Sequence, residues 1–278
     1  VFEKLITRHE SRKSSHVNLH ALHRCGTSPT IVFLHGLADS SAIWAPVLKH
    51  MTATNEILVV DLAGHGISDW LVDGDYTVNC LSELASKQIS VRSARSIILV
   101  GHSLGGELAV EIADANQSET CGVVVIDHNP YLAQEMRAML REFMATAKTS
   151  FRSREEYEKE LVDNMPRLSA EIASWLSRSM LKEEDGKFAL LTDPNVSNML
   201  AGTTNNTVSF HAASTRTLII RGANSSILSK SDAGRFCEAL GSQSWSIDIP
   251  DSGHAVPLEQ PAAIAAVIDD FVLLNGAS

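Results

Sequence analysis

The sequence predicts an α/β fold in which buried strands end in loops that carry reactive side chains. Three observations support this class. Short apolar runs recur along the chain, a sharp turn around Ser103 joins one run directly to a helix, and a final helix begins in the segment 257–261. The runs that predict strands are residues 31–34, 57–60, 97–100, 122–126, 216–222 and 245–250.

The N-terminal part of the chain predicts a β-hairpin with polar residues on an exposed face. His16, His20 and His23 fall in this stretch. Because an exposed strand face accounts for polar side chains at these positions, we predict no metal there. The four cysteines are widely scattered and have no paired spacing that indicates zinc or a redox couple.

The turn around Ser103 indicates nucleophilic chemistry. The strand at 97–100 runs into Gly101-His102-Ser103-Leu104-Gly105, and residues 106–115 predict a helix. A serine in such a turn is held in a strained backbone conformation, so that its hydroxyl projects above the sheet edge. The flanking glycines leave room for the helix to pass close to the strand. We therefore predict that Ser103 is a nucleophile.

A nucleophilic serine needs a base, and His254 is the best candidate among the eleven histidines. It lies in a glycine-containing loop directly after the predicted strand at 245–250 and before the final helix. A histidine in such a loop can reach a serine presented by an earlier strand. The sequence therefore predicts that His254 accepts the proton of Ser103.

The oxyanion formed by serine attack is usually held by two backbone N–H groups. One should belong to Leu104, directly after the nucleophile, and the other to the loop that follows an earlier strand. The strand at 31–34 ends in His35-Gly36-Leu37. We predict that the amides of Leu37 and Leu104 form the oxyanion hole.

Taken together, these motifs resemble the α/β-hydrolase superfamily from about residue 17 to the end of the chain. The residues that carry the resemblance are His35-Gly36 with Trp44, DLAGHGIS at 61–68, GHSLGG at 101–106 and SGHAVPLEQP at 252–261. The resemblance implies an eight-stranded, mostly parallel sheet with helices on both faces. It also implies a nucleophile, an acid and a histidine in that chain order, but not a particular substrate.

The acid is the member of the triad that departs from the common pattern. Many relatives place it three residues after the glycine that ends the strand at 216–222, where this chain has Ser225. Other relatives carry it after the sixth strand, here residues 122–126, which ends at Asp127. An anion is needed to orient the histidine and stabilise its cation. We predict Asp127, with Asn224, Ser225 or a remote carboxylate as the alternatives.

Residues 131–213 are far more than a simple crossover between strands requires. Apolar spacing predicts helices over 132–147, 168–181 and, more weakly, 193–200, and the capping box at Ser153 predicts another. The insertion resembles the superfamily's helical cap, which divides the chain into a core (1–130 and 214–278) and a cap (131–213). A methionine-rich face on the first cap helix would favour a hydrophobic acyl group.

Composition agrees with an enzyme that acts on small molecules. The 278 residues carry 33 acidic and 23 basic side chains, a net charge of −10, which disfavours nucleic acid and anionic membranes as partners. No apolar run is long enough to span a bilayer, and the first ten residues lack the apolar segment of a signal peptide. A cytoplasmic location is therefore expected.

The function predicted from the sequence is that of a cofactor-independent serine hydrolase. Its substrate would be a small acyl compound, free or linked to a carrier, that contains an ester, thioester or lactone. Hydrolysis of an amide or a carbon–carbon bond uses the same residues and remains an alternative. So do a lyase that uses Ser103 and His254 without an acyl-enzyme, and a small-molecule receptor that turns over slowly.

Overall fold

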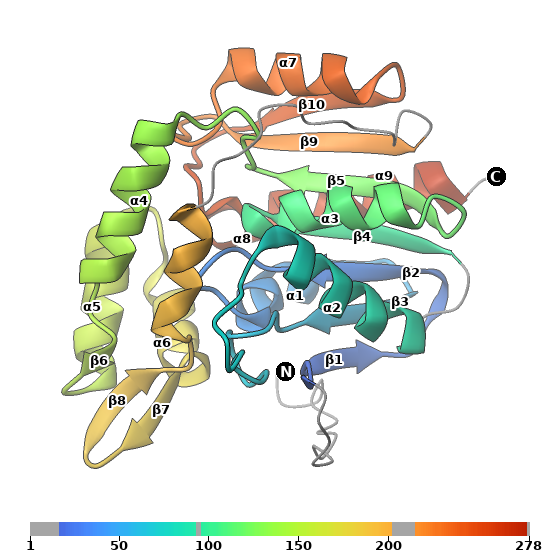
Figure 1. Cartoon of the computed structure of the whole chain (residues 1–278). Helices are drawn as coiled ribbons and strands as arrows, with labels where there is room; N and C mark the ends of the chain where they lie inside the picture. The colour runs from blue at the N-terminus through green and yellow to red at the C-terminus, as the bar shows by residue number, and fades with distance from the viewer. Residues whose placement is uncertain (1–16, 93–95, 202–214, 277–278) are drawn as a thin grey trace.

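The computed structural model of the protein describes residues 17–92, 96–201 and 215–276. Seven strands in these residues form one sheet in the order β1-β3-β2-β4-β5-β9-β10 (Figure 1). They are β1 (Ala21–Arg24), β2 (Thr27–Leu34), β3 (Asn55–Val60), β4 (Ile97–His102), β5 (Thr120–Ile126), β9 (Arg216–Gly222) and β10 (Ser244–Ile249). All neighbouring pairs are parallel except β1 with β3.

The described sheet therefore has seven strands where the resemblance implied eight. At its N-terminal edge β1 pairs with β3 and not with the strand next to it in sequence. The remainder of the predicted N-terminal hairpin, with His16, lies outside the described residues. The parallel sheet with helices on both faces is confirmed.

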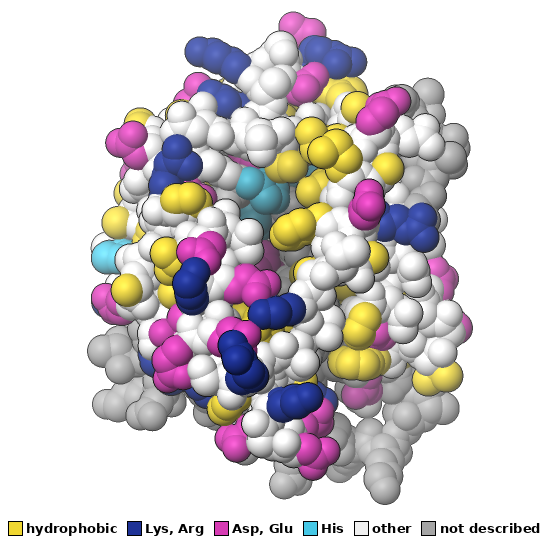
Figure 2. Space-filling view, turned by 90° about the vertical axis from the view of Figure 1, so that its left-hand side faces the viewer, with side chains coloured by type: hydrophobic (Ala, Val, Ile, Leu, Met, Phe, Trp, Pro, Cys, Tyr) yellow, Lys and Arg dark blue, Asp and Glu magenta, His cyan; other side chains and the backbone are white. Residues whose placement is uncertain are grey.

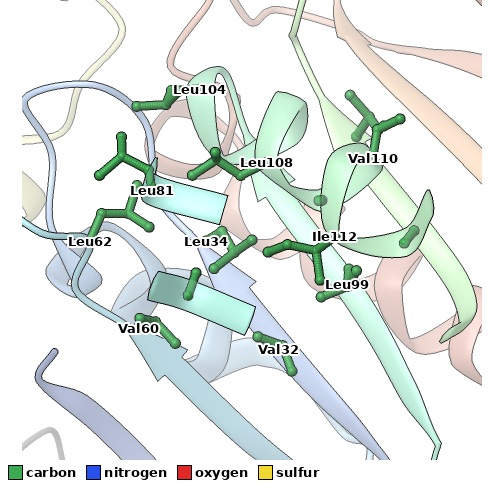
Figure 3. Close-up of a cluster of buried hydrophobic side chains, with 14 of the residues drawn as sticks. Val32, Leu34, Val60, Leu62, Leu81, Leu99, Leu104, Leu108, Val110 and Ile112 are labelled. Atoms are coloured by element: carbon green, nitrogen blue, oxygen red, sulfur yellow. The ribbon is translucent and has the colours of Figure 1, made fainter. Parts of the chain in front are cut away.

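The central strands are apolar throughout because both faces of the sheet are covered. Alternate side chains point to opposite faces, so Val32 and Leu34 join one buried cluster while Ile31 and Phe33 join the other. Figure 3 shows part of the first cluster, where Leu108 and Ile112 of a helix pack over Leu34 and Leu99. Each strand is thus held from both sides, and the strand ends are left to carry chemistry.

Helices supply this cover on both faces. α2 (Val78–Arg92), α3 (Leu104–Ala115) and α7 (Lys230–Leu240) contribute side chains to the first cluster. α1 (Ala45–His50) and α9 (Pro261–Gly276) contribute to the second. The short helix α8 (Val256–Glu259) precedes α9, and a 3-10 helix, η2 (Ser41–Trp44), precedes α1. No helix in the described part of the chain is both long enough and apolar enough to cross a bilayer.

The segment after β5 forms a separate layer at the end of the sheet where β5 ends (Figure 1). It contains α4 (Gln134–Thr146), α5 (Arg154–Asn164), α6 (Ala170–Ser179) and a 3-10 helix, η3 (Pro194–Ala201). Half of the predicted capping box is present: the Ser153 hydroxyl accepts a hydrogen bond from the Glu156 amide at 3.2 Å, whereas the Glu156 carboxylate accepts one from the Arg152 amide at 2.7 Å. The predicted cap boundary at residue 213 lies outside the described residues, so the division into core and cap stays a prediction.

This layer also holds a three-stranded antiparallel sheet that the sequence analysis did not predict. Its strands are β6 (Ser150–Phe151), β7 (Leu181–Glu184) and β8 (Lys187–Leu190), in the order β6-β8-β7. Asp185 and Gly186 join β7 to β8, and both have positive φ, 49° and 73°. An Asp-Gly pair in that conformation is a strong hairpin signal. The helix predicted to run to residue 181 accordingly ends at Ser179.

Candidate active site

Ser103 occupies the turn between β4 and α3, and its backbone has the strained conformation that the sequence predicted. Its φ is +51° and its amide donates to the carbonyl of Ile126 at 2.9 Å. The glycines on either side of Ser103 are required because neither position has room for a side chain. A Cβ on Gly101 would lie 2.0 Å from the Gly105 carbonyl oxygen, and one on Gly105 would lie 2.2 Å from that of Leu34. The helix therefore packs against the sheet only because both positions lack a side chain.

Asp127 follows β5 directly and is completely buried. Its Oδ1 accepts a hydrogen bond from the Gly222 amide at 2.9 Å. Its Oδ2 accepts one from Ser225 Oγ at 2.5 Å and one from His254 Nδ1 at 2.8 Å. Three donors from the ends of β9 and β10 thus converge on one carboxylate.

The structure brings His254 to Asp127 and not to either neutral alternative. Ser225, at the position where many relatives keep their acid, bonds to Asp127. The Asn224 amide donates to the Ser252 carbonyl at 2.8 Å. Sequence reasoning treated Ser225 only as a competitor of Asp127, although a hydroxyl at that position can equally support a carboxylate on the neighbouring strand.

The loop of His254 is held by contacts on both sides. The His254 carbonyl accepts a hydrogen bond from His102 Nε2 at 2.9 Å, and the two rings lie 4.9 Å apart. The Gly253 amide donates to Glu259 Oε2 at 2.6 Å. His102 precedes Ser103, so the loop of the predicted base is attached to the turn of the predicted nucleophile. No hydrogen bond joins the Ser103 hydroxyl to His254 in the described residues, and such contacts often tighten only around bound substrate.

The loop after β2 passes directly against the serine. A Cβ on Gly36 would lie 3.4 Å from Ser103 Cβ, which brings the next residue, Leu37, to the predicted site. Leu104 begins α3, where helix amides have no partner within the helix. Neither the Leu37 nor the Leu104 amide donates to a backbone carbonyl elsewhere in the described chain. Both are therefore available to an oxyanion.

Several buried titratable groups surround these residues. Burial lowers the pKa of His102, but Asp39, 3.8 Å from its Nδ1, together with the His254 carbonyl and the charge of Asp127, raises it further than burial lowers it. Burial, with the positive charges of Arg137 and His254, lowers the pKa of His128 to about 3. Burial also raises the pKa of Glu107, and Arg137 offsets part of that shift.

The N-terminal histidines that the structure describes each contact a carboxylate. His20 Nδ1 lies 2.9 Å from Asp61 Oδ2, and His23 Nε2 lies 2.6 Å from Glu56 Oε1. No group of three or more potential metal ligands is found among the described residues. The prediction that the protein needs no metal stays a prediction.

The site opens onto the side of the molecule that carries the layer after β5. Figure 2 shows a hollow there, with histidine on its wall, hydrophobic side chains around it and acidic side chains deeper inside. Asp127, His254, Ser103 and the Leu37 loop all lie at strand ends on one edge of a parallel sheet. In open α/β sheets, ligands bind at this edge.

Comparison with known proteins agrees with this arrangement. A model of the "Alpha/beta hydrolase family" matches residues 31–267. The chain is 25% identical over 249 residues to the 2-(acetamidomethylene)succinate hydrolase of Mesorhizobium japonicum, covering 89% of both proteins. It is 30% identical over 126 residues to esterase Rv0045c of Mycobacterium tuberculosis, covering 45% of this chain and 42% of the esterase.

Solved structures show the same fold. The crystal structure of E-2-(acetamidomethylene)succinate hydrolase superposes with a TM-score of 0.83 at 23% identity, covering 92% of this chain and 95% of that one. The thioesterase domain from the curacin biosynthetic pathway superposes with a TM-score of 0.77 at 18% identity, covering 92% and 96%. The chain therefore belongs to the alpha/beta hydrolase family.

Proposed function

We propose that the protein is a serine hydrolase that cleaves an ester, thioester or lactone through an acyl-enzyme on Ser103. The observation that carries this proposal is the 2.8 Å contact of His254 with the buried Asp127 at the same sheet edge as the strained Ser103. A buried anion on Nδ1 leaves Nε2 as the basic nitrogen of His254.

In this mechanism Ser103 Oγ attacks the substrate carbonyl carbon while His254 Nε2 takes the hydroxyl proton. The amides of Leu37 and Leu104 bind the resulting oxyanion. His254 then gives its proton to the leaving group, and the acyl group stays on Ser103. A water molecule that His254 deprotonates attacks the acyl-enzyme, and His254 then returns that proton to Ser103 Oγ as the bond to the acyl group breaks, which releases the acid and restores the serine. Asp127 stabilises the imidazolium in both steps.

The relatives support hydrolysis without naming the substrate of this chain. By name, one hydrolyses 2-(acetamidomethylene)succinate, one is an esterase and one is a thioesterase domain. Amide and carbon–carbon bond hydrolysis use the same chemistry at the serine. The test must therefore compare bond types and also detect the acyl-enzyme.

The experiment is turnover on a panel in which one acyl group is presented as p-nitrophenyl ester, thioester, lactone and anilide. We expect hydrolysis of at least one of the first three linkages, its loss in Ser103→Ala, and an acyl adduct on Ser103 detected by mass spectrometry of quenched reactions. Turnover that survives Ser103→Ala would contradict the mechanism. A folded protein without turnover but with ligand binding would favour the receptor alternative, and turnover without an adduct would favour the lyase.

A further inference from the structure

The inner face of α4 carries a positive charge. Four residues of this helix, Met136, Arg137, Leu140 and Met144, are half-buried, and the others are exposed. Met144 packs on the buried cluster that contains Leu104, so this side of α4 faces the core. Arg137 lies two helical turns before Met144 and shares that face. It is the one charged residue among the four.

Arg137 has no partner in the part of the chain that the structure describes. Its Nε is buried and makes no hydrogen bond. No carboxylate of the described residues lies within 4.0 Å of its guanidinium group. The side chain as a whole is half-buried, and a buried donor that lacks an acceptor is costly. A bound anion would supply the acceptor that this Nε lacks.

Two residues that neighbour Ser103 and Asp127 along the chain respond to the charge of Arg137. Its charge acts on Glu107, which lies on the first turn of α3 after Ser103, and on His128, the residue after Asp127. A Cβ on Gly106 would lie 3.1 Å from His128 Cβ, so His128 packs directly on that first turn. Neither residue neutralises the arginine: Glu107 forms no ion pair with it within 4.0 Å, and a histidine carries no negative charge in either protonation state.

We propose that Arg137 binds a carboxylate on the acyl part of the substrate, so that the preferred substrates are monoesters or monothioesters of dicarboxylic acids. This rests on the proposed hydrolase function. A guanidinium group presents paired N–H donors that match the two oxygens of a carboxylate.

This inference revises the acyl group expected from the methionine-rich helix. Met139 and Phe143, two of the apolar residues that predicted a hydrophobic lining, are 64% and 59% exposed. The inner face instead combines three apolar side chains with one arginine. A short acyl chain that ends in a negative charge fits that face better than a long alkyl chain.

The test compares an anionic acyl group with its neutral isostere. The mono-p-nitrophenyl esters of glutaric and adipic acid are paired with the p-nitrophenyl esters of the corresponding monoamides, and the rate without enzyme is subtracted. We expect kcat/KM to be at least about tenfold higher for the carboxylates, on the scale of a charge-assisted hydrogen bond. Arg137→Gln should abolish this preference mainly through KM, with the amides changed by less than about twofold.

Two further variants control this comparison. Arg137→Lys should retain part of the preference because it keeps the charge but loses the paired donors. Arg178→Gln, on the exposed surface of α6, removes the same charge from the same layer and should keep the whole preference. Circular dichroism of each variant checks that the fold is intact.

A second measurement does not depend on turnover. Isothermal titration of Ser103→Ala with glutarate should show binding that is weakened at least about tenfold when Arg137→Gln is added. Equal kcat/KM for carboxylate and amide esters in the wild-type protein, or a preference that survives Arg137→Gln, overturns the proposal. If no ester is hydrolysed, the proposed function fails separately, and the titration alone decides whether Arg137 holds a carboxylate.

Discussion

At the scale of single residues, the proposed mechanism requires the Asp127 carboxylate to stabilise the protonated form of His254. It is fully buried and accepts hydrogen bonds from Gly222, Ser225 and His254. Asp127→Asn keeps the shape but removes the anion that stabilises the imidazolium. We expect kcat to fall by about 10⁴ with little change in the far-ultraviolet circular dichroism spectrum. A loss below about tenfold would exclude Asp127 as the acid.

A substitution at Ser225 distinguishes the effect of orienting the Asp127 carboxylate from the effect of its negative charge. Its hydroxyl supplies one of the donors to Asp127 but does not touch the imidazole. Because a neutral hydrogen bond contributes about 0.5–1.5 kcal/mol, Ser225→Ala should lower kcat/KM by no more than about tenfold. Steady-state kinetics beside Asp127→Asn provide the comparison. An equal loss of kcat/KM in Ser225→Ala and Asp127→Asn would contradict the view that the charge of the carboxylate is what stabilises the His254 cation.

At the scale of elements, the approach of α3 to β2 holds the nucleophile in position. A Cβ on Gly105 would lie 2.2 Å from the Leu34 carbonyl oxygen and could not be accommodated without moving the helix. Gly105→Ala should therefore lower the free energy of unfolding by about 3 kcal/mol or prevent folding. The measurement is equilibrium unfolding in urea.

Gly234, inside α7, is the matched control for that substitution. Nothing lies within 4 Å of a Cβ built at this position. Gly234→Ala should therefore raise the free energy of unfolding by about 0.5–1 kcal/mol, because alanine loses less conformational freedom than glycine in a helix. Similar effects of the two substitutions would contradict the steric explanation for Gly105.

The layer after β5 shows which elements local sequence patterns can predict and which they cannot. The capping pattern at Ser153 located the start of α5 because the contact of the Ser153 hydroxyl with the Glu156 amide is local. The Asp185-Gly186 hairpin signal was equally local but lay among residues whose apolar spacing favoured helices. Apolar spacing alone does not say which side of a helix another element covers: of the three methionines of α4, Met139 is exposed, whereas Met136 and Met144 are half-buried.

At the scale of the whole molecule, buried histidines make stability depend on pH. Burial lowers the pKa of His35, and lowers the pKa of His65 and His128 to about 3, from an ordinary value of 6.5. These residues stay neutral when folded but take up protons when unfolded. The free energy of unfolding is therefore not reduced by these residues above pH 6.5, and it decreases as the pH falls from 6.5 toward 3. His102, whose pKa is raised, acts in the opposite direction.

The net effect of these four histidines is loss of stability in mild acid. Each neutral buried histidine contributes up to about 1.4 kcal/mol per pH unit. We expect the free energy of unfolding in urea to be at least about 2 kcal/mol lower at pH 5.0 than at pH 7.5. Equal stability at the two values would mean that the buried histidines are protonated in the folded protein.

The sequence by itself determined the features that depend on neighbouring residues. The apolar runs, the glycines around Ser103 and the loop of His254 identified the α/β fold, the family and two of the proposed catalytic residues. Only the tertiary structure decided which acid meets His254 and that the buried Nε of Arg137 has no hydrogen-bond acceptor among the described residues. Asp127, Ser225 and His254 follow three different strands, and the pairing of β5, β9 and β10 brings them together. Such contacts depend on strand order and on burial, which no local pattern specifies.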